Sequence, residues 1–177
     1  MVSKDFKEIF TAEIFSVTGA LIAGSLLAFQ VDKLLLLPGL FILIPGFLEM
    51  RGSITGSLAA RLSEKLHMGL ERSERHILII ENILAAFTLA LVVAVVLGIF
   101  AYIASYFIFG VTIVDLIYIP ILGSIISSII VIPLTIFATF WFFEHKIDPD
   151  NVMGPVATTI GDIVGVASLL LAIVIVI

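Results

Sequence analysis

The fold is decided by an unbroken apolar stretch in the middle of the chain, ILAAFTLALVVAVVLGIFAYIASYFIFGVTIV, which runs from residue 83 to residue 114. It carries no charged side chain over 32 residues, whereas roughly 20 apolar residues suffice to cross a bilayer core as a helix. Two further charge-free runs, residues 116–143 and 14–31, are 28 and 18 residues long. Because unpaired backbone polar groups are too costly in hydrocarbon, these runs predict helices. The chain is therefore expected to be an all-α integral membrane protein.

The composition excludes several other classes of protein. Of 177 residues, 61% are apolar and 13% are charged, while a soluble domain has about 25% charged residues. We expect one transmembrane domain over residues 1–177, with no separate soluble domain and with the lipid bilayer as its surroundings. The net charge of −5 argues against a nucleic-acid partner, and the absence of cysteine excludes disulfides and thiolate metal sites.

The hydropathy pattern predicts five transmembrane helices, at residues 10–31, 34–62, 77–109, 116–143 and 151–177, of which the second is interrupted by Pro38 and Pro45. The connection at residues 63–76 is predicted to be a short solvated helix. Lys and Arg gather at the N-terminus and in the second and fourth connections, while Lys33 is alone on the other side; the seven are Lys4, Lys7, Arg61, Lys65, Arg72, Arg75 and Lys146. Since cytoplasmic loops carry the excess of basic residues, we expect a multi-pass protein of the cell membrane, with the N-terminus inside and the C-terminus outside.

Asp162 gives the strongest functional signal. If the last helix begins near Asn151, Asp162 lies eleven residues into it, a depth of ~16 Å and so about the middle of the bilayer core. An Asp there costs about 2.5–3.5 kcal/mol. We interpret Asp162 as a cation ligand, with Thr158 and Thr159 supplying further oxygens, because hard divalent cations prefer oxygen ligands. The alternative is a structural Asp that is hydrogen-bonded to a hydroxyl or protonated. Small or polar residues share its helix face: Gly154, Thr158, Gly161 and Gly165.

The second predicted helix carries charges at membrane depth. Glu49 and Arg51 are two residues apart and so point to different faces. In one interpretation Glu49 and Ser53, with Gly52 beside them, line the same aqueous path as Asp162. In the other, Arg51 reaches lipid headgroups or a neighbouring carboxylate, and Glu49 binds a hydroxyl.

The segment Asp148-Pro-Asp-Asn is expected to start the last helix, capped by Asp150 or Asn151. The residues Asp148, Asp150 and Asn151 are also a possible inner mouth that concentrates cations. The three histidines, His67, His76 and His145, have no zinc-site spacing, and we interpret them as ordinary interfacial residues. No nucleophile–base arrangement, phosphate loop or paired-carboxylate pattern is present, so we expect neither an enzyme nor an organic cofactor.

These residues resemble the MgtE-type magnesium transporter family, in particular its short prokaryotic forms and its eukaryotic solute-carrier relatives. Pro45-Gly-Phe-Leu-Glu-Met-Arg-Gly-Ser followed by Ala60-Arg-Leu-Ser is similar to the family pattern in the second helix. Asp148-Pro-Asp-Asn-Val, with Pro155 and Thr159-Ile-Gly-Asp, is similar to its pattern in the fifth helix. Two departures are that Ser53 replaces the family's Asn and that the family's soluble sensing domains are absent from the chain.

The resemblance implies a homodimer of five-helix protomers around a central pore. Asp162 of both chains would bind a largely hydrated Mg²⁺ as the transported ion, helped by the backbone carbonyl of Thr158, and Thr159, Gly161, Gly52, Glu49 and Ser53 would line the pore or support its ligands. We therefore expect transport of divalent cations, most of all Mg²⁺, through a path at the homodimer axis. A Na⁺- or H⁺-coupled Mg²⁺ exchanger and a non-transporting membrane subunit are the alternatives.

Overall fold

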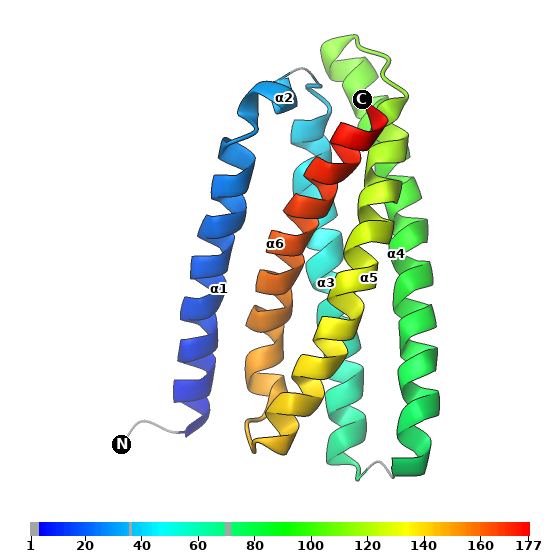
Figure 1. Ribbon diagram of the computed structural model, residues 1–177. Helices are drawn as coiled ribbons and strands as arrows, with labels where there is room; N and C mark the ends of the chain where they lie inside the picture. The colour runs from blue at the N-terminus through cyan, green and yellow to red at the C-terminus, as the bar shows by residue number, and fades with distance from the viewer. Residues whose placement is uncertain (1–3, 36, 70–71) are drawn as a thin grey trace.

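The computed structural model describes residues 4–35, 37–69 and 72–177, and within these ranges it is helical and has no strand. Five long helices run side by side, and one short helix lies between the first two (Figure 1). Four of them are long and apolar enough to cross a membrane, namely α1, α4, α5 and α6. The all-α class expected from the sequence is thus confirmed. The helices are α1 (Lys4–Ala28), α2 (Val31–Leu35), α3 (Leu40–His67), α4 (Arg72–Phe109), α5 (Asp115–Glu144) and α6 (Pro149–Val176).

Of the two interruptions expected in the span at residues 34–62, at Pro38 and at Pro45, only the first breaks the helix. The chain breaks between α2 and α3, at Pro38 and Gly39, because proline lacks a backbone N–H and disfavours helical geometry in the residue before it. Pro45, by contrast, lies inside α3. This helix continues to His67 and α4 already begins at Arg72, so the expected separate helix at residues 63–76 is absent from its described part; residues 70–71 lie outside the described residues.

Helix α3 lies in the interior of the bundle. It packs against α4, α5 and α6 and is seen behind α5 and α6 in Figure 1. Five of its large apolar side chains are fully buried: Leu40, Leu43, Phe47, Leu58 and Leu62. In a bilayer such contacts stabilise by van der Waals packing, because lipid is as apolar as leucine. The three neighbouring helices also shield one side of α3 from lipid, which allows that side to carry polar groups.

Arg51 is a charged side chain on the enclosed side of α3. Its side chain is 0% exposed, and Nη1 donates a hydrogen bond of 2.9 Å to Oγ of Ser128 on α5. Nε and Nη2 have no hydrogen-bond partner among the described residues. The expectation that Arg51 reaches headgroups or a carboxylate is therefore wrong, since the guanidinium lies inside the protomer and binds a hydroxyl.

Two glycines of α6 make room for Arg51. A Cβ atom added at Gly161 would lie 3.7 Å from Cβ of Arg51, and one added at Gly165 would lie 3.6 Å from its Cγ. The aliphatic stem of Arg51 thus fills the contact between α3 and α6, while its head reaches α5. Small residues at every fourth position let helix backbones approach closely, and here they do so within one protomer.

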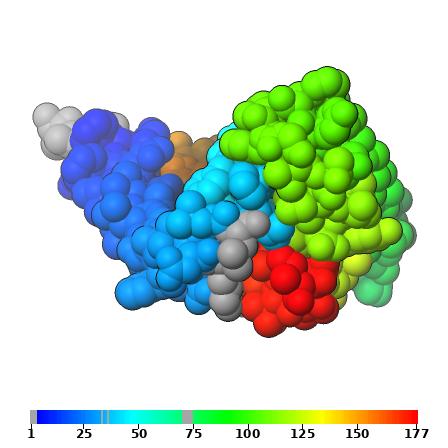
Figure 2. Space-filling model, turned by 90° about the horizontal axis from the view of Figure 1, so that it is seen from above, coloured from blue at the N-terminus to red at the C-terminus, as the bar shows by residue number. Residues whose placement is uncertain are grey.

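Helix α1 packs on α6 and lies at one side of the molecule, with α4 on the opposite side (Figure 2). Its contact face carries small buried residues, Ala12, Gly19 and Ala23. Gly19 lies directly against the side chain of Thr159. At the start of α1, Glu8 accepts a hydrogen bond of 3.1 Å from Nδ2 of Asn151, which joins the first turns of α1 and α6.

The contact between Gly19 and Thr159 predicts a difference between two glycines of α1. Thr159 cannot turn away freely, because its Oγ1 donates a 2.8 Å hydrogen bond to the Pro155 carbonyl. We expect Gly19→Leu to lower the free energy of unfolding by about 1–3 kcal/mol. Gly24→Leu is the matched control, since nothing lies within 4 Å of a Cβ at Gly24. Thermal unfolding in detergent measures both, and equal midpoints would contradict the packing.

The bond between Arg51 and Ser128 predicts that Ser128→Ala is destabilising by about 1.5–3 kcal/mol, because it leaves a buried cation without its hydroxyl partner. Ser127→Ala is the control. Ser127 is also 0% exposed, but its hydroxyl binds only the Ser124 carbonyl of its own helix, at 3.3 Å. Its loss should cost no more than about 1 kcal/mol. Unfolding in mixed micelles measures both free energies, and a control that is equally damaging would refute this role of Ser128.

Candidate functional site

A groove of about 270 Å³ lies between α3 and α6. It brings together five of the residues expected at the site, two from α6 (Thr158 and Asp162) and three from α3 (Glu49, Gly52 and Ser53). The apolar side chains of Pro45 and Leu48 complete its lining. Glu49 and Ser53 are exposed and Asp162 is half-buried, so two carboxylates and two hydroxyl groups are accessible from one side of the protomer.

Close approach of the two helices creates this arrangement. A Cβ at Gly52 would lie 3.6 Å from Oγ1 of Thr158, and one at Gly161 would lie 3.9 Å from the backbone nitrogen of Gly52. Gly52 and Gly161 therefore let the backbones of α3 and α6 meet directly beneath the groove. As a result, Glu49 and Asp162 line one small cavity although they are far apart in the sequence.

Thr158 has only part of its oxygen capacity free. Its Oγ1 donates a 3.0 Å hydrogen bond to the Gly154 carbonyl, so the hydroxyl can still accept or coordinate but has no proton left for another partner. Because α6 is helical through this segment, the Thr158 carbonyl belongs to the helix ladder and keeps a second lone pair. Both oxygens can support a cation, but neither is a strong ligand alone.

The remaining residues expected on α6 lie elsewhere. Thr159 is buried and faces Gly19 of α1, and Gly161 lies against the backbone of α3. Neither belongs to the groove lining that the structure describes. Gly161 lies where the two walls meet and Thr159 packs α6 against α1, and neither presents polar atoms to the groove.

The groove is the centre of a polar row on the protomer surface. On α3, exposed residues follow one another at every fourth position: Pro45, Glu49, Ser53, Ser57 and Arg61. On α6, Asp150, Gly154, Thr158 and Asp162 have the same spacing, and the first two of these are exposed. The side of α3 that carries Arg51 is enclosed by neighbouring helices, whereas the side that carries Glu49 is open.

The segment expected to form an inner mouth lies where α6 begins. Asp148 is the N-cap, and its Oδ1 accepts a 3.0 Å hydrogen bond from the backbone N–H of Asp150. The expectation that Asp150 or Asn151 caps the helix is wrong, because Pro149 occupies the first helical position and Asp148 therefore stands at the cap. Asn151 binds Glu8 of α1 instead.

Two residues, Ser128 and Glu8, have partners that the sequence does not indicate. Ser128 stands in a row of serines that could signal a buried hydroxyl face, yet its pairing with Arg51 joins α5 to α3. Glu8 is one of several acidic residues near the N-terminus, and nothing in its spacing points to its bond with Asn151. Neither partner could be found without the tertiary arrangement.

No curated protein and no solved structure matches the chain. The MgtE family model, which describes a divalent cation transporter, matches residues 44–172. The matched region covers well over half of the chain and includes both walls of the groove, from the early turns of α3 to the last turns of α6. The chain is therefore a multi-pass membrane protein that belongs to the MgtE family of divalent cation transporters.

Proposed function

We propose that this protein transports Mg²⁺ across the cell membrane along a path at the axis of a homodimer, with Asp162 of both chains as the central ligand. The observation that carries the proposal is the groove between α3 and α6, which leaves two carboxylates open on the protomer surface. Family membership supports divalent cation transport. The choice of ion, the path and the ligand rest on the chemistry of the groove.

An open carboxylate at membrane depth needs a polar surrounding. Glu49 lies nine residues into α3 and Asp162 thirteen residues into α6, which is about 13 and 20 Å along their helices. At such depths a charged group facing lipid is costly, and charged residues of membrane helices normally face protein or water. A second copy placed groove to groove would cover both residues, because a two-fold axis pairs each surface patch with itself.

A dimer with the two grooves facing each other needs a cation between the chains. Two copies would bring four carboxylates, from Glu49 and Asp162 of each chain, around one axis, where their charges repel one another. A divalent ion on the axis relieves this repulsion. Mg²⁺ fits the available groups, since it keeps several water ligands and needs only one or two carboxylates. Ser53 adds a hydroxyl oxygen where the family pattern has an amide, and an oxygen donor is thus preserved.

The size of the groove agrees with a hydrated ion. Six water molecules occupy roughly 180 Å³ at their share of liquid volume, and each protomer contributes a groove of about 270 Å³. Two facing grooves therefore offer room for Mg²⁺ with most of its water shell. The ion need not be stripped of water, which agrees with how reluctantly Mg²⁺ dehydrates.

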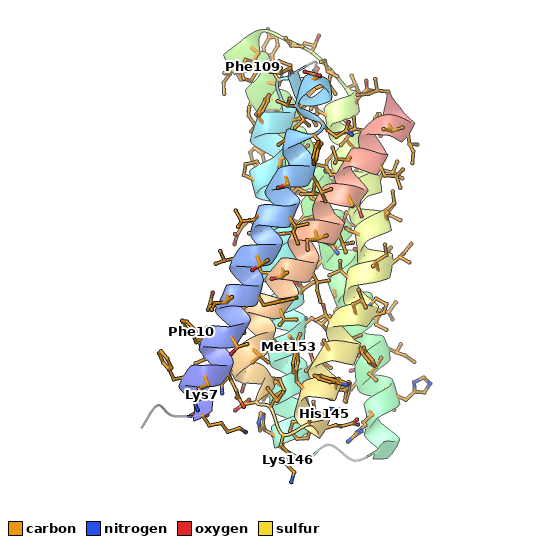
Figure 3. All side chains as sticks on the ribbon, turned by 60° about the vertical axis from the view of Figure 1, so that its left-hand side comes forward. Lys7, Phe10, Phe109, His145, Lys146 and Met153 are labelled. Carbon is orange, nitrogen blue, oxygen red and sulfur yellow. The ribbon has the colours of Figure 1, made fainter. Side chains whose placement is uncertain are left out.

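The distribution of basic residues supports an inside N-terminus. Lys7, His145 and Lys146 lie at one end of the bundle and Phe109 at the other (Figure 3). The end with Lys7 also holds the beginnings of α1 and α4 and the end of α3, where Lys4, Lys65 and Arg75 are located. Basic residues favour the cytoplasmic side, so the path opens to the cytoplasm beside the first turn of α6.

The central prediction concerns Asp162→Asn in proteoliposomes. We expect Mg²⁺ uptake to fall at least about tenfold, since an amide cannot balance the ion's charge. A loss of about 1.4 kcal/mol in the binding free energy of the ion already gives this factor. Asp32→Asn is the control and should keep full uptake, since Asp32 is exposed in α2. Equal flux from Asp162→Asn and the native chain would remove Asp162 from the path.

The same assay separates the candidate transport mechanisms. Flux that follows only the Mg²⁺ gradient and the membrane voltage supports an uncoupled path. Flux that follows an imposed Na⁺ or pH gradient would show the exchanger instead. No uptake from the native chain under any of these gradients would favour the non-transporting subunit.

The homodimer predicts a specific cross-link. The chain has no cysteine, so a single introduced thiol reports on its own position. We expect Ser53→Cys in native membranes to form dimers with a short bis-maleimide, which adds to one thiol at each end, because Ser53 would face its counterpart across the axis. Val92→Cys is the control, since Val92 is 57% exposed near the middle of α4 on another side of the bundle. Cross-linking of Val92→Cys but not of Ser53→Cys would place the interface elsewhere.

A further inference from the structure

We propose a second metal site, formed by His67, Asp148 and Asp150, which binds a transition-metal ion of the Zn²⁺ type and slows transport when occupied. One ligand atom from each of the three residues lies within 4.8 Å of the others. His67 ends α3, and Asp148 caps α6 with Asp150 in its first turn. The site thus joins the ends of the two helices that form the groove, at the end of the bundle that carries the basic residues.

The histidine is already oriented as a ligand. Nδ1 of His67 lies 3.0 Å from the Ser63 carbonyl, to which it donates in the tautomer that carries the proton on Nδ1. In that tautomer Nε2 keeps its lone pair for a metal ion, and it lies 3.7 Å from Oδ1 of Asp148. Metal-binding histidines characteristically donate their other ring N–H to a carbonyl or carboxylate, which fixes the ring. The ring of Phe143 packs edge-on against His67, with centroids 5.5 Å apart, and restrains it further.

The start of α6 holds the two carboxylates together. The backbone N–H of Asp150 donates a hydrogen bond of 3.0 Å to Asp148, and this bond fixes the turn between the two residues. Pro149 restricts the backbone between them. The helix N-terminus favours negative charge, but it does not remove the repulsion between neighbouring carboxylates. A divalent ion would offset that repulsion and would use the lone pair of His67 as well.

The ligand set selects the class of ion. Mg²⁺ prefers oxygen ligands, whereas an imidazole favours Zn²⁺ and related first-row metals. Zn²⁺ binds nitrogen and carboxylate oxygen at about 2.0–2.2 Å, so the three ligand atoms must draw together by small side-chain rotations. Asp150 is exposed and free to make the larger part of this movement. Beside the site, one cavity of about 640 Å³ is lined by three cationic side chains and three carboxylates, whose formal charges balance: Lys4, Arg75 and Lys146, and Asp5, Glu8 and Glu144.

The effect on transport rests on the proposed function. Asp150, Gly154, Thr158 and Asp162 are spaced four residues apart on α6, so the metal would lie at the inner end of the face that carries the central ligand. An ion bound to both helices would restrain any separation of α3 from α6. Occupancy is therefore expected to lower Mg²⁺ flux.

Calorimetric titration of the full chain in nanodiscs with Zn²⁺, in excess Mg²⁺, tests the site. We expect one Zn²⁺ per chain, with affinity reduced at least about tenfold in His67→Gln and in Asp150→Asn. His145→Gln is the matched control and should bind as the native chain does. His145 also has Nδ1 within 2.8 Å of the carbonyl four residues earlier, that of Trp141, but it is outside the cluster.

Asp162→Asn distinguishes this site from the groove. Undiminished Zn²⁺ binding by this variant supports a separate site, whatever its Mg²⁺ flux, and loss of Zn²⁺ binding would overturn it. Native affinity in His67→Gln would also overturn it, as would equal losses in His67→Gln and His145→Gln. In proteoliposomes, Zn²⁺ on the side of His67 should slow Mg²⁺ flux through the native chain but not through His67→Gln; equal slowing of both would overturn the effect on transport.

Discussion

In hydrocarbon, a charged or polar side chain is stable only where protein, water or an ion surrounds it. Helix α3 shows both consequences of this constraint. Its inner side carries Arg51, which is fully enclosed and binds Ser128. Its outer side carries Glu49, which is open to the surroundings of the protomer together with Asp162 of α6. The first charge is accommodated within one chain, while the second requires something outside it.

The two sides of α3 meet the same neighbour. Gly161 and Gly165 of α6 accept the stem of Arg51, and Gly52 of α3 lets Thr158 approach. The contact that buries the cation therefore also fixes the spacing of the groove walls. An alanine at Gly161 would make ordinary contacts with Arg51, whereas a longer side chain would push α6 away from Arg51 and widen the groove. The same contact between α3 and α6 therefore determines both the packing of the core and the geometry of the site.

The sequence was sufficient for features that depend on local chemistry. Long charge-free runs predicted the apolar helices, and the spacing of Glu49, Ser53, Thr158 and Asp162 predicted the side chains that the groove brings together. It was not sufficient where neighbours decide. Pro38 breaks a helix and Pro45 does not, although both are prolines in an apolar run. Arg51 looked suited to headgroups because its partner Ser128 is distant in sequence, and the cap at Asp148 became clear only from the helix start.

The two candidate metal sites have different ligand atoms, and each set of ligands suits the position of its site. At membrane depth the groove offers carboxylate and hydroxyl oxygens and no imidazole, which suits an ion that keeps its water and leaves again. At the end of the bundle, His67 adds a nitrogen ligand to two carboxylates, which favours tighter binding of a different ion. A nitrogen ligand in the groove would hold transition metals on the path that we propose for Mg²⁺. His67 lies instead at the surface, between the ends of α3 and α6. The candidate Zn²⁺ site is thus separate from the proposed path, although both sites lie on the same pair of helices.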